Sequence, residues 1–299
     1  MINFITSLAV VGLLTMTGFD FLNTNLVGNF YSETREGIAP QKIINQSLGI
    51  KATAKNILIA DKKSGLELYK KNEKEIVPIA SITKLMTALV ILDNNPNWDE
   101  LITILPQDQI EGGIIYFFSG EQARFRDLFN LMLVASSNEA AAALARNSGI
   151  SDFSSAMNKK AREIGMENTY FSEPSGIESS NISTAANLLK LAETAFDIEE
   201  IILALKIRNY EFNTINTKRK VKAYATNQLL SSFLNSGKYE ILGGKTGYIN
   251  KAGYCLILRV RENSGPIITM VILGSESIES RWQEAKGLID WVFRNYEWT

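Results

Sequence analysis

The sequence predicts an α+β fold in which one antiparallel sheet takes strands from both ends of the domain. Two observations support this arrangement. Strand-like runs occur early, at 56–60 and 66–69, and again late, at 252–260 and 267–273. The sequence between them has mostly helical periodicity. With 299 residues the chain is long enough to bury a large core. We therefore expect a central helical region between two groups of strands.

The N-terminal part of the chain differs from the rest. Residues 1–19 carry no charged side chain, and the apolar run 8–14 is typical of a secretory signal. We expect 1–19 to be a signal peptide or an uncleaved N-terminal anchor, with a buried helix as the alternative. Residues 20–51 are irregular and polar, which predicts a linker or an arm wrapped on the domain. The folded domain is expected at 52–299.

The first elements of the domain are a hairpin and a helix. Residues 56–60 and 66–69 are strand candidates, and 61–65 has the composition of a turn. The following helix is expected to begin near Ser81 and to run to about Asp93. Leucines recur along it at helical spacing, so one side is apolar enough to be buried. These leucines are Leu85, Leu89 and Leu92.

The central region has a short strand candidate at 101–105 and a series of helices. The expected helices are 126–134, 139–146, 151–164 and one that opens at 183. The break at 135–138 separates the first two, and Ser137 and Asn138 are residue types that cap a helix N-terminus. We also expect a surface hairpin at 210–222, because this stretch is polar and rich in β-branched residues.

The C-terminal part changes character again. Residues 243–247 are expected to form a turn or the start of a strand. The runs 252–260 and 267–273 predict buried strands around a turn at 262–265. An amphipathic helix is expected at 280–296. These strands would join the early hairpin in one sheet.

The composition excludes several kinds of site. The chain has no histidine, so it cannot form a Ser-His-Asp triad or a His-based zinc site. Its single cysteine, Cys255, excludes an intrachain disulfide and lies in an apolar run as a core residue would. The net charge of −1 gives no support for a nucleic-acid partner. We expect no metal and no cofactor.

Ser81 and Lys84 are three residues apart, which on a helix places both side chains on one face. A serine hydroxyl is a poor nucleophile until a base takes its proton. A lysine in partly apolar surroundings has a lowered pKa and can act as that base. A bare S-x-x-K occurs by chance in many proteins, so this pair alone predicts no more than an amphipathic helix.

Two further motifs follow in the chain. The three motifs in order are Ser81-x-x-Lys84, Ser136-x-Asn138 and Lys245-Thr246-Gly247. Each lies in a suitable context: a helix start, a break between helices, and a strand after a glycine pair. This order is the known signature of the serine β-lactamases and penicillin-binding proteins.

From 56 to 298 the chain resembles the low-molecular-weight penicillin-binding proteins, the D-alanyl-D-alanine carboxypeptidase and endopeptidase family. Longer segments also carry the resemblance, namely 78–88, 173–176 with 181–184, and 244–248 with 252–254. It implies a β-lactamase/transpeptidase-like fold and a DD-peptidase catalytic domain at 52–299. It also implies a part in peptidoglycan biosynthesis and remodelling.

Chemistry and the resemblance together suggest a role for each catalytic residue. Ser81 would attack the carbonyl between the two D-alanines and form an acyl-enzyme, and Lys84 would take its proton. Ser136 would relay a proton between Lys84 or Lys245 and the leaving amine. The N–H groups of Ser81 and Tyr248 would form the oxyanion hole.

The remaining site residues would bind substrate. Asn138 would orient the peptide bond with its amide. Lys245 and Thr246 would hold the terminal carboxylate. Gly247 would let the substrate backbone lie close to the strand. The sequence departs from the family pattern at Ser137, where Gly or Ala is frequent, and at Ile249, where Thr or Ser is common.

Several activities stay open at this point. Carboxypeptidase trimming and endopeptidase cleavage of cross-links use the same residues. A β-lactamase would need a deacylating Glu in an E-x-x-L-N pattern, which is absent, and Ser137 stands where S-D-N has Asp. A silent peptidoglycan-binding module would not need both Ser81 and Lys84. A cytosolic esterase of this fold is a further alternative.

The expected partners follow from the resemblance. They are peptidoglycan peptides ending in D-Ala-D-Ala, with β-lactam antibiotics as covalent inhibitors. Membrane contact is expected only through 1–19 if this segment is not cleaved. The protein is accordingly expected to be exported, and to be periplasmic or otherwise extracytoplasmic.

Overall fold

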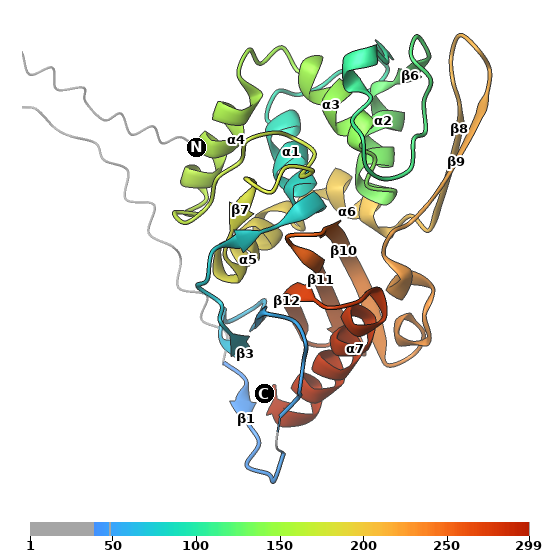
Figure 1. The fold of residues 1–299 in the computed structure, drawn as a ribbon. Helices are drawn as coiled ribbons and strands as arrows, with labels where there is room; N and C mark the ends of the chain where they lie inside the picture. The colour runs from blue at the N-terminus through green and yellow to red at the C-terminus, as the bar shows by residue number, and fades with distance from the viewer. Residues whose placement is uncertain (1–38, 48, 299) are drawn as a thin grey trace, which may run out of the picture. The chain divides into compact units, whose positions relative to one another are not determined.

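The computed structural model describes residues 39–47 and 49–298 (Figure 1). The expected signal or anchor at 1–19 lies outside the described residues, as does 20–38 of the expected arm. In the described part of the arm, β1 (Gln41–Lys42) pairs antiparallel with β13 (Tyr296–Glu297). Within the described residues, no helix combines the length and the apolar character needed to span a bilayer.

One five-stranded antiparallel sheet joins the two ends of the domain, as predicted (Figure 1). Its spatial order is β10-β11-β12-β2-β3. The strands are β2 (Asn56–Asp61), β3 (Glu67–Lys71), β10 (Tyr239–Ile249), β11 (Gly253–Glu262) and β12 (Ile267–Ser275). Because β12 pairs with β2, the last long strand of the chain lies beside the first.

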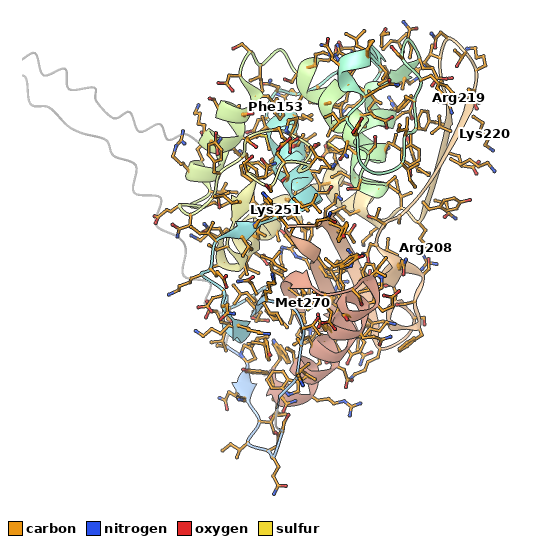
Figure 2. All side chains as sticks on the ribbon, viewed as in Figure 1. Phe153, Arg208, Arg219, Lys220, Lys251 and Met270 are labelled. Atoms are coloured by element: carbon orange, nitrogen blue, oxygen red, sulfur yellow. The ribbon has the colours of Figure 1, made fainter. Side chains whose placement is uncertain are left out.

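The sheet separates two cores, because successive side chains of a strand point to opposite faces. On β2, Ile57 and Ile59 pack with α7 (Ile278–Asn295), whereas Leu58 faces the helical region. β12 has the same alternation, and the labelled Met270 belongs to the α7 side (Figure 2). The sheet is therefore covered on both faces.

The helical region lies between β3 and β10 in sequence. Its helices are α1 (Thr83–Leu92), α2 (Phe125–Val134), α3 (Asn138–Arg146), α4 (Phe153–Glu163), α5 (Ala185–Ala195) and α6 (Glu199–Lys206). Small antiparallel pairs join β4 (Val77–Pro78) to β7 (Ile182–Ser183), β5 (Leu101–Thr103) to β6 (Gln122–Arg124), and β8 (Asn209–Asn213) to β9 (Lys220–Tyr224). The predicted helices and the 210–222 hairpin are present.

Side-chain caps fix the starts of three of these helices. Ser137 accepts a hydrogen bond from the Ala140 N–H at the start of α3, and Asp152 accepts one from Ser155 at the start of α4. Thr184 caps α5 in the same way. An N-cap of this kind satisfies an N–H group that has no partner within the helix.

Helix α1 is more deeply buried than its leucine spacing predicted. Its residues from Thr83 to Ile91 are all buried, so that helices and sheet surround it. A 3₁₀ turn, η1 (Ala80–Ile82), precedes it and carries Ser81. The polar side chains buried within α1 are therefore held away from water; they are Thr83, Lys84 and Thr87.

Several elements differ from the sequence-based expectation. The helix α6 and the short strands β1, β4, β6, β7 and β13 were not predicted, and β10 begins at Tyr239 rather than near 243. The glycine pair in β10 accounts for the difference in that strand. A Cβ on Gly243 would lie 2.8 Å from Ile202 of α6, and one on Gly244 would lie 2.7 Å from Leu258 of β11. The glycines thus permit close packing inside a strand, where the sequence alone suggests a turn.

Candidate active site

A cleft of about 740 Å³ lies beside β10 and contains residues of all three motifs. Six predicted site residues line it, namely Ser81, Ser136, Asn138, Thr246, Gly247 and Tyr248. The two lysines, Lys84 and Lys245, have no exposed surface and contact lining residues from behind. The structure therefore brings all eight predicted site residues together.

Two glycines from distant segments control the position of Ser81. Ala80 has a φ of +50°, an uncommon conformation for a residue with a side chain. A Cβ on Gly176 would lie 2.1 Å from the Ala80 carbonyl oxygen. A Cβ on Gly247 would lie 3.0 Å from the Ser81 nitrogen. The turn that presents Ser81 is therefore packed between two backbones that only glycine allows to come so close.

Lys84 is placed to act on Ser81. Its Nζ lies 3.0 Å from Ser81 Oγ and 2.7 Å from Asn138 Oδ1, and it also donates to the Ser175 carbonyl. Burial lowers the pKa of Lys84 to about 7, and the negative charge of Glu173 opposes this shift only in part. A large share of Lys84 is therefore neutral near pH 7, with a lone pair for a hydroxyl proton.

Lys245 forms the second lysine–serine pair. Its Nζ lies 2.7 Å from Ser136 Oγ and donates to the Thr246 carbonyl. Burial, with the positive charges of Lys84 and Arg281, holds the pKa of Lys245 well below its usual range. Ser136 has a φ of +61°, which is rare outside glycine and typical of functional sites. The cleft therefore has a second contact between a hydroxyl and an amine besides the Ser81–Lys84 pair.

Asn138 is held at both ends of its amide. Its Oδ1 accepts from Lys84, and its Nδ2 donates to the Gly112 carbonyl at 2.7 Å. The remaining Nδ2 hydrogen has no protein acceptor among the described contacts and is available to the cleft.

The 173–176 segment, singled out in the sequence without a role, supports Lys84. The Glu173 carboxylate accepts from the N–H groups of Ser175 and Gly176, each at 2.6 Å, and from the Asn181 amide. These contacts fix the turn whose Ser175 carbonyl faces Lys84.

Sequence analysis missed Arg281, which lies in the cleft wall. Its guanidinium is 4.1 Å from the Trp282 ring centre, and it contacts the Gly247 and Cys255 carbonyls. Burial lowers the pKa of Arg281 to about 10, and its Nε has no hydrogen-bond partner among the described residues. In the sequence it is one charge on an amphipathic helix, with no local motif to mark it.

Other polar and aromatic groups complete this side of the cleft. Thr246 Oγ1 donates to Thr226 Oγ1 at 2.6 Å, and Thr226 was also missed. Tyr248 stacks on Tyr254 with ring centres 4.3 Å apart. Ile249 lines the cleft and offers no hydroxyl there. Among the described residues, no group of three or more His, Cys, Asp or Glu side chains is arranged to hold a metal.

The profile of the D-alanyl-D-alanine carboxypeptidase family matches residues 41–276, which is more than half of the chain. The chain belongs to this family. The match spans the sheet, the helical region and all three motifs. The resemblance inferred from the short motifs is thereby confirmed.

Individual relatives and solved structures of similar sequence are consistent with this family. A D-alanyl-D-alanine endopeptidase of Pseudomonas aeruginosa is 34% identical over 79% of this chain and 76% of its own length. The Streptomyces K15 DD-transpeptidase has a TM-score of 0.76 at 27% identity, over 83% of this chain and all of its own. Penicillin-binding protein D2 of Listeria monocytogenes, solved in an ampicillin-bound form, has a TM-score of 0.71 at 28% identity, over 83% and 100%. The β-lactamase/transpeptidase-like fold is likewise confirmed.

The lowered pKa of Lys84 predicts how acylation depends on pH. Lys84 can accept the Ser81 proton only when neutral, so acylation by a β-lactam should quicken as pH rises through about 7. We expect a rise of about tenfold between about pH 6 and pH 8. The acylation rate can be measured at each pH by stopping the labelling reaction at a series of times, with circular dichroism to check that the protein stays folded. A rate that stays level would contradict the role of Lys84 as base.

Proposed function

We propose that the protein is a serine-type D-Ala-D-Ala carboxypeptidase that acts on peptidoglycan stem peptides through an acyl-enzyme. The strongest support for the proposal is the pairing of Ser81 with Lys84. A fully buried lysine of lowered pKa lies 3.0 Å from Ser81 Oγ, at the floor of a cleft that also holds the Lys245–Ser136 pair. This is a nucleophile with its base, beside a cationic subsite.

Acylation is the first step of the proposed reaction. Ser81 Oγ attacks the carbonyl carbon between the two D-alanines while its proton passes to neutral Lys84. The carbonyl oxygen gains negative charge and accepts hydrogen bonds from the N–H groups of Ser81 and Tyr248. The close approach of Gly247 to the Ser81 nitrogen supports this pair of donors. Loss of one such donor typically costs about 2.7–4 kcal/mol in the barrier.

Collapse of the tetrahedral intermediate breaks the peptide bond and needs a proton on the leaving amine. Ser136 passes that proton from Lys84 or Lys245 to the D-alanine nitrogen. Its hydroxyl, 2.7 Å from Lys245 Nζ and exposed to the cleft, supports this assignment. Water then attacks the Ser81 ester, and the peptide is released.

Substrate binding uses the positive charge at the β10 side of the cleft. Thr246 and Arg281, which line the cleft, bind the terminal carboxylate, and Lys245 contributes from behind Ser136. Asn138 offers an amide hydrogen to the substrate peptide bond. Gly247 leaves room for the substrate backbone to lie against the strand.

Endopeptidase activity is the second candidate, and the P. aeruginosa relative favours it. The same acylation chemistry applies, but the leaving amine belongs to a second stem peptide instead of a free D-alanine. Ile249 makes this edge of the cleft more apolar than Thr or Ser would. The two activities differ in the leaving amine, whereas the same protein groups act on the peptide bond that is cleaved.

We further propose that the protein is exported and works on the extracytoplasmic cell wall. The uncharged segment 1–19 with its apolar run supports export, and the proposed substrate lies outside the cytoplasmic membrane. In this proposal a membrane contact is made only by 1–19, and β-lactams act as covalent inhibitors. No cofactor and no nucleic acid take part.

Fluorescent penicillin should label the folded protein covalently, and Ser81→Ala should abolish labelling without unfolding the domain. Gel fluorescence with a thermal unfolding curve measures both. The control is Ser236→Ala, an exposed serine bonded to the Phe233 carbonyl, which should label like the wild type. A folded wild-type protein that stays unlabelled would contradict the proposed acyl-enzyme function.

Purified enzyme should release D-alanine from a stem pentapeptide, as followed by chromatography and mass spectrometry. A cross-linked dimer serves as the parallel substrate. Release of D-alanine from the pentapeptide with an untouched dimer would exclude the endopeptidase candidate. Cleavage of the dimer alone would make the endopeptidase the correct assignment.

Cell fractionation and the intact mass of the recovered protein test export. We expect the protein outside the cytoplasm, either shortened by cleavage after the apolar run 8–14 or held in the membrane fraction by an uncleaved segment. A full-length protein in the cytosolic fraction would contradict this proposal and would favour the esterase alternative.

A further inference from the structure

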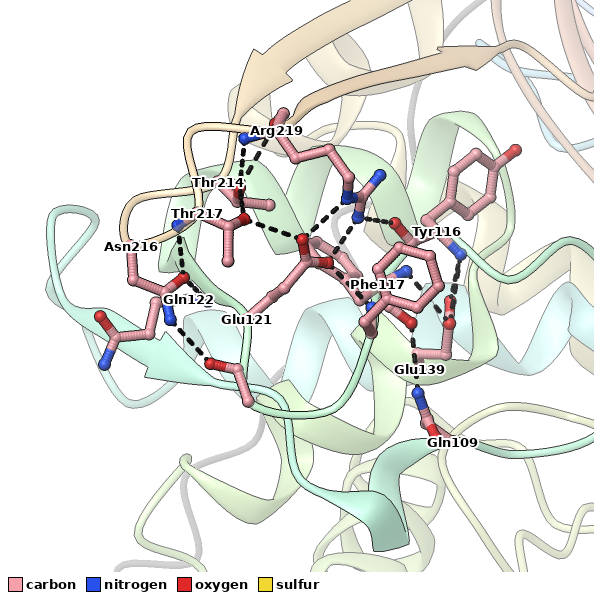
Figure 3. A network of polar contacts seen from close by, with 12 residues as sticks. Gln109, Tyr116, Phe117, Glu121, Gln122, Glu139, Thr214, Asn216, Thr217 and Arg219 are labelled. Atoms are coloured by element: carbon pink, nitrogen blue, oxygen red, sulfur yellow. Dashed lines mark hydrogen bonds and ion pairs between the residues drawn. The ribbon is translucent and has the colours of Figure 1, made fainter.

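Glu139 directly follows the second motif and is 2% exposed. Both of its carboxylate oxygens accept from the Tyr116 N–H at 3.2 Å, and Oε1 also accepts from the Phe117 N–H at 3.4 Å. The Ser137 hydroxyl donates to Oε2 at 3.1 Å. One buried carboxylate at the start of α3 therefore holds the backbone of a distant segment (Figure 3).

Arg219 holds the same segment from the other side. It lies toward the tip of the β8–β9 hairpin (Figure 2) and donates to the Tyr116 carbonyl at 2.7 Å. It also forms a two-pronged contact with the Glu121 carboxylate, at 2.7 and 2.5 Å. Its guanidinium carbon is 4.9 Å from the centre of the Phe118 ring. Figure 3 shows the Tyr116 backbone between Glu139 and Arg219.

The held segment leads into the cleft. We call residues 112–118 the cleft-edge segment. Its first residues, Gly112, Gly113 and Ile114, line the cleft, and its last residues are those that Glu139 and Arg219 hold. The Gly112 carbonyl accepts from Asn138 Nδ2. A shift of the segment where Glu139 holds it would therefore also move the Gly112 carbonyl, to which the neighbouring Asn138 amide is bonded.

The orientation of the Asn138 amide matters to Lys84. An asparagine side chain has a donor end and an acceptor end, and a half-turn exchanges them. The Gly112 carbonyl can accept only from the donor end. While Gly112 stays in place, Oδ1 is directed to Lys84 Nζ, 2.7 Å away. If the cleft-edge segment moves, the hydrogen bond from Lys84 is the described contact left to direct Oδ1, and a neutral Lys84 amine can equally accept from Nδ2.

We propose that Glu139 is a positioning residue: by holding the cleft-edge segment, it sets the orientation of Asn138 beside Lys84 for the reaction at Ser81. Arg219 assists from the hairpin side. The inference rests on the proposed acyl-enzyme function. It assigns a role in catalysis to a carboxylate that lies outside the cleft lining.

The required group is a carboxylate, because it offers two acceptor oxygens and no donor. The Tyr116 N–H lies 3.2 Å from both carboxylate oxygens, so in Glu139→Gln it would face the amide nitrogen in either orientation of the new side chain. Two donors would then meet in a buried place, and the cleft-edge segment would shift to separate them. A small displacement of this kind changes the geometry at Ser81 without removing any group that touches substrate.

The chain offers a matched control. Glu284 is also a buried glutamate that accepts from two backbone N–H groups, those of Thr53 and Ala54, and from one serine hydroxyl, that of Ser275. It joins α7 to the N-terminal end of β2 and does not line the cleft. Glu284→Gln therefore imposes the same chemical change on the fold without moving the cleft-edge segment.

The test compares wild type, Glu139→Gln and Glu284→Gln, all full-length. For each we would measure the thermal midpoint, the second-order rate of penicillin acylation, and kcat and KM on a D-Ala-D-Ala peptide. We expect Glu139→Gln to acylate between about tenfold and a hundredfold more slowly, as small misplacements near a reacting centre do, with the loss mainly in kcat. Glu284→Gln should lower the thermal midpoint by about as much as Glu139→Gln does. Its rate of acylation should equal that of the wild type.

Two results would overturn the inference: Glu139→Gln acylating at the wild-type rate, or both variants losing acylation in proportion to their stability. If Glu139→Gln does not fold, Arg219→Lys decides instead. A lysine cannot span the Tyr116 carbonyl and Glu121 as the guanidinium fork does, so acylation should fall while folding persists. An unchanged rate there would overturn the inference. A wild-type protein that penicillin does not label would instead be a failure of the proposed function.

Discussion

The burial of the Lys84 amine beside Ser81 is the constraint on which the site depends. An ammonium group in water would neither approach neutrality near pH 7 nor stay fixed at 3.0 Å from a hydroxyl. Removing it from water requires that α1 be enclosed on all sides, which explains why a helix that carries a lysine is so fully buried. The sheet and the surrounding helices thus exclude water from the Lys84 amine.

The acceptors around Lys84 come from separate parts of the helical region. Asn138 belongs to α3, and Ser175 belongs to a turn that Glu173 fixes. With Ser81 Oγ they match the three N–H bonds of an ammonium, so the protonated form is also satisfied when it occurs. The amine can therefore gain and lose a proton with the Ser81 hydroxyl hydrogen as the one neighbouring group that has to turn.

Much of this arrangement could be predicted from the sequence, because its signals are local. The spacing of Ser81 and Lys84 on one helix, the break at Ser136 and the strand run after Lys245 are each visible within a few residues. Patterns of apolar residues also predicted α7 and four of the five sheet strands, β2, β3, β11 and β12. The parts that were missed depend on tertiary packing. Arg281 is indistinguishable from a surface charge until the helix is docked. The glycine pair in β10 suggests a turn until α6 and β11 are seen packed against it. Glu139 resembles an ordinary first-turn carboxylate, and only the fold shows that it binds the segment near Tyr116.

The close approach of Gly176 and Gly247 to the turn at Ser81 has a consequence for biosynthesis. Both glycines are added to the growing chain after Ser81, and the strand that carries Gly247 is added after the whole helical region. Until those segments dock, the Ala80 backbone lacks the two close contacts that hold its left-handed conformation. The serine therefore becomes reactive only when the domain is nearly complete. Nascent or partly folded chains would be unable to form a lasting ester with substrate or antibiotic, and acyl transfer would begin only after folding has ended.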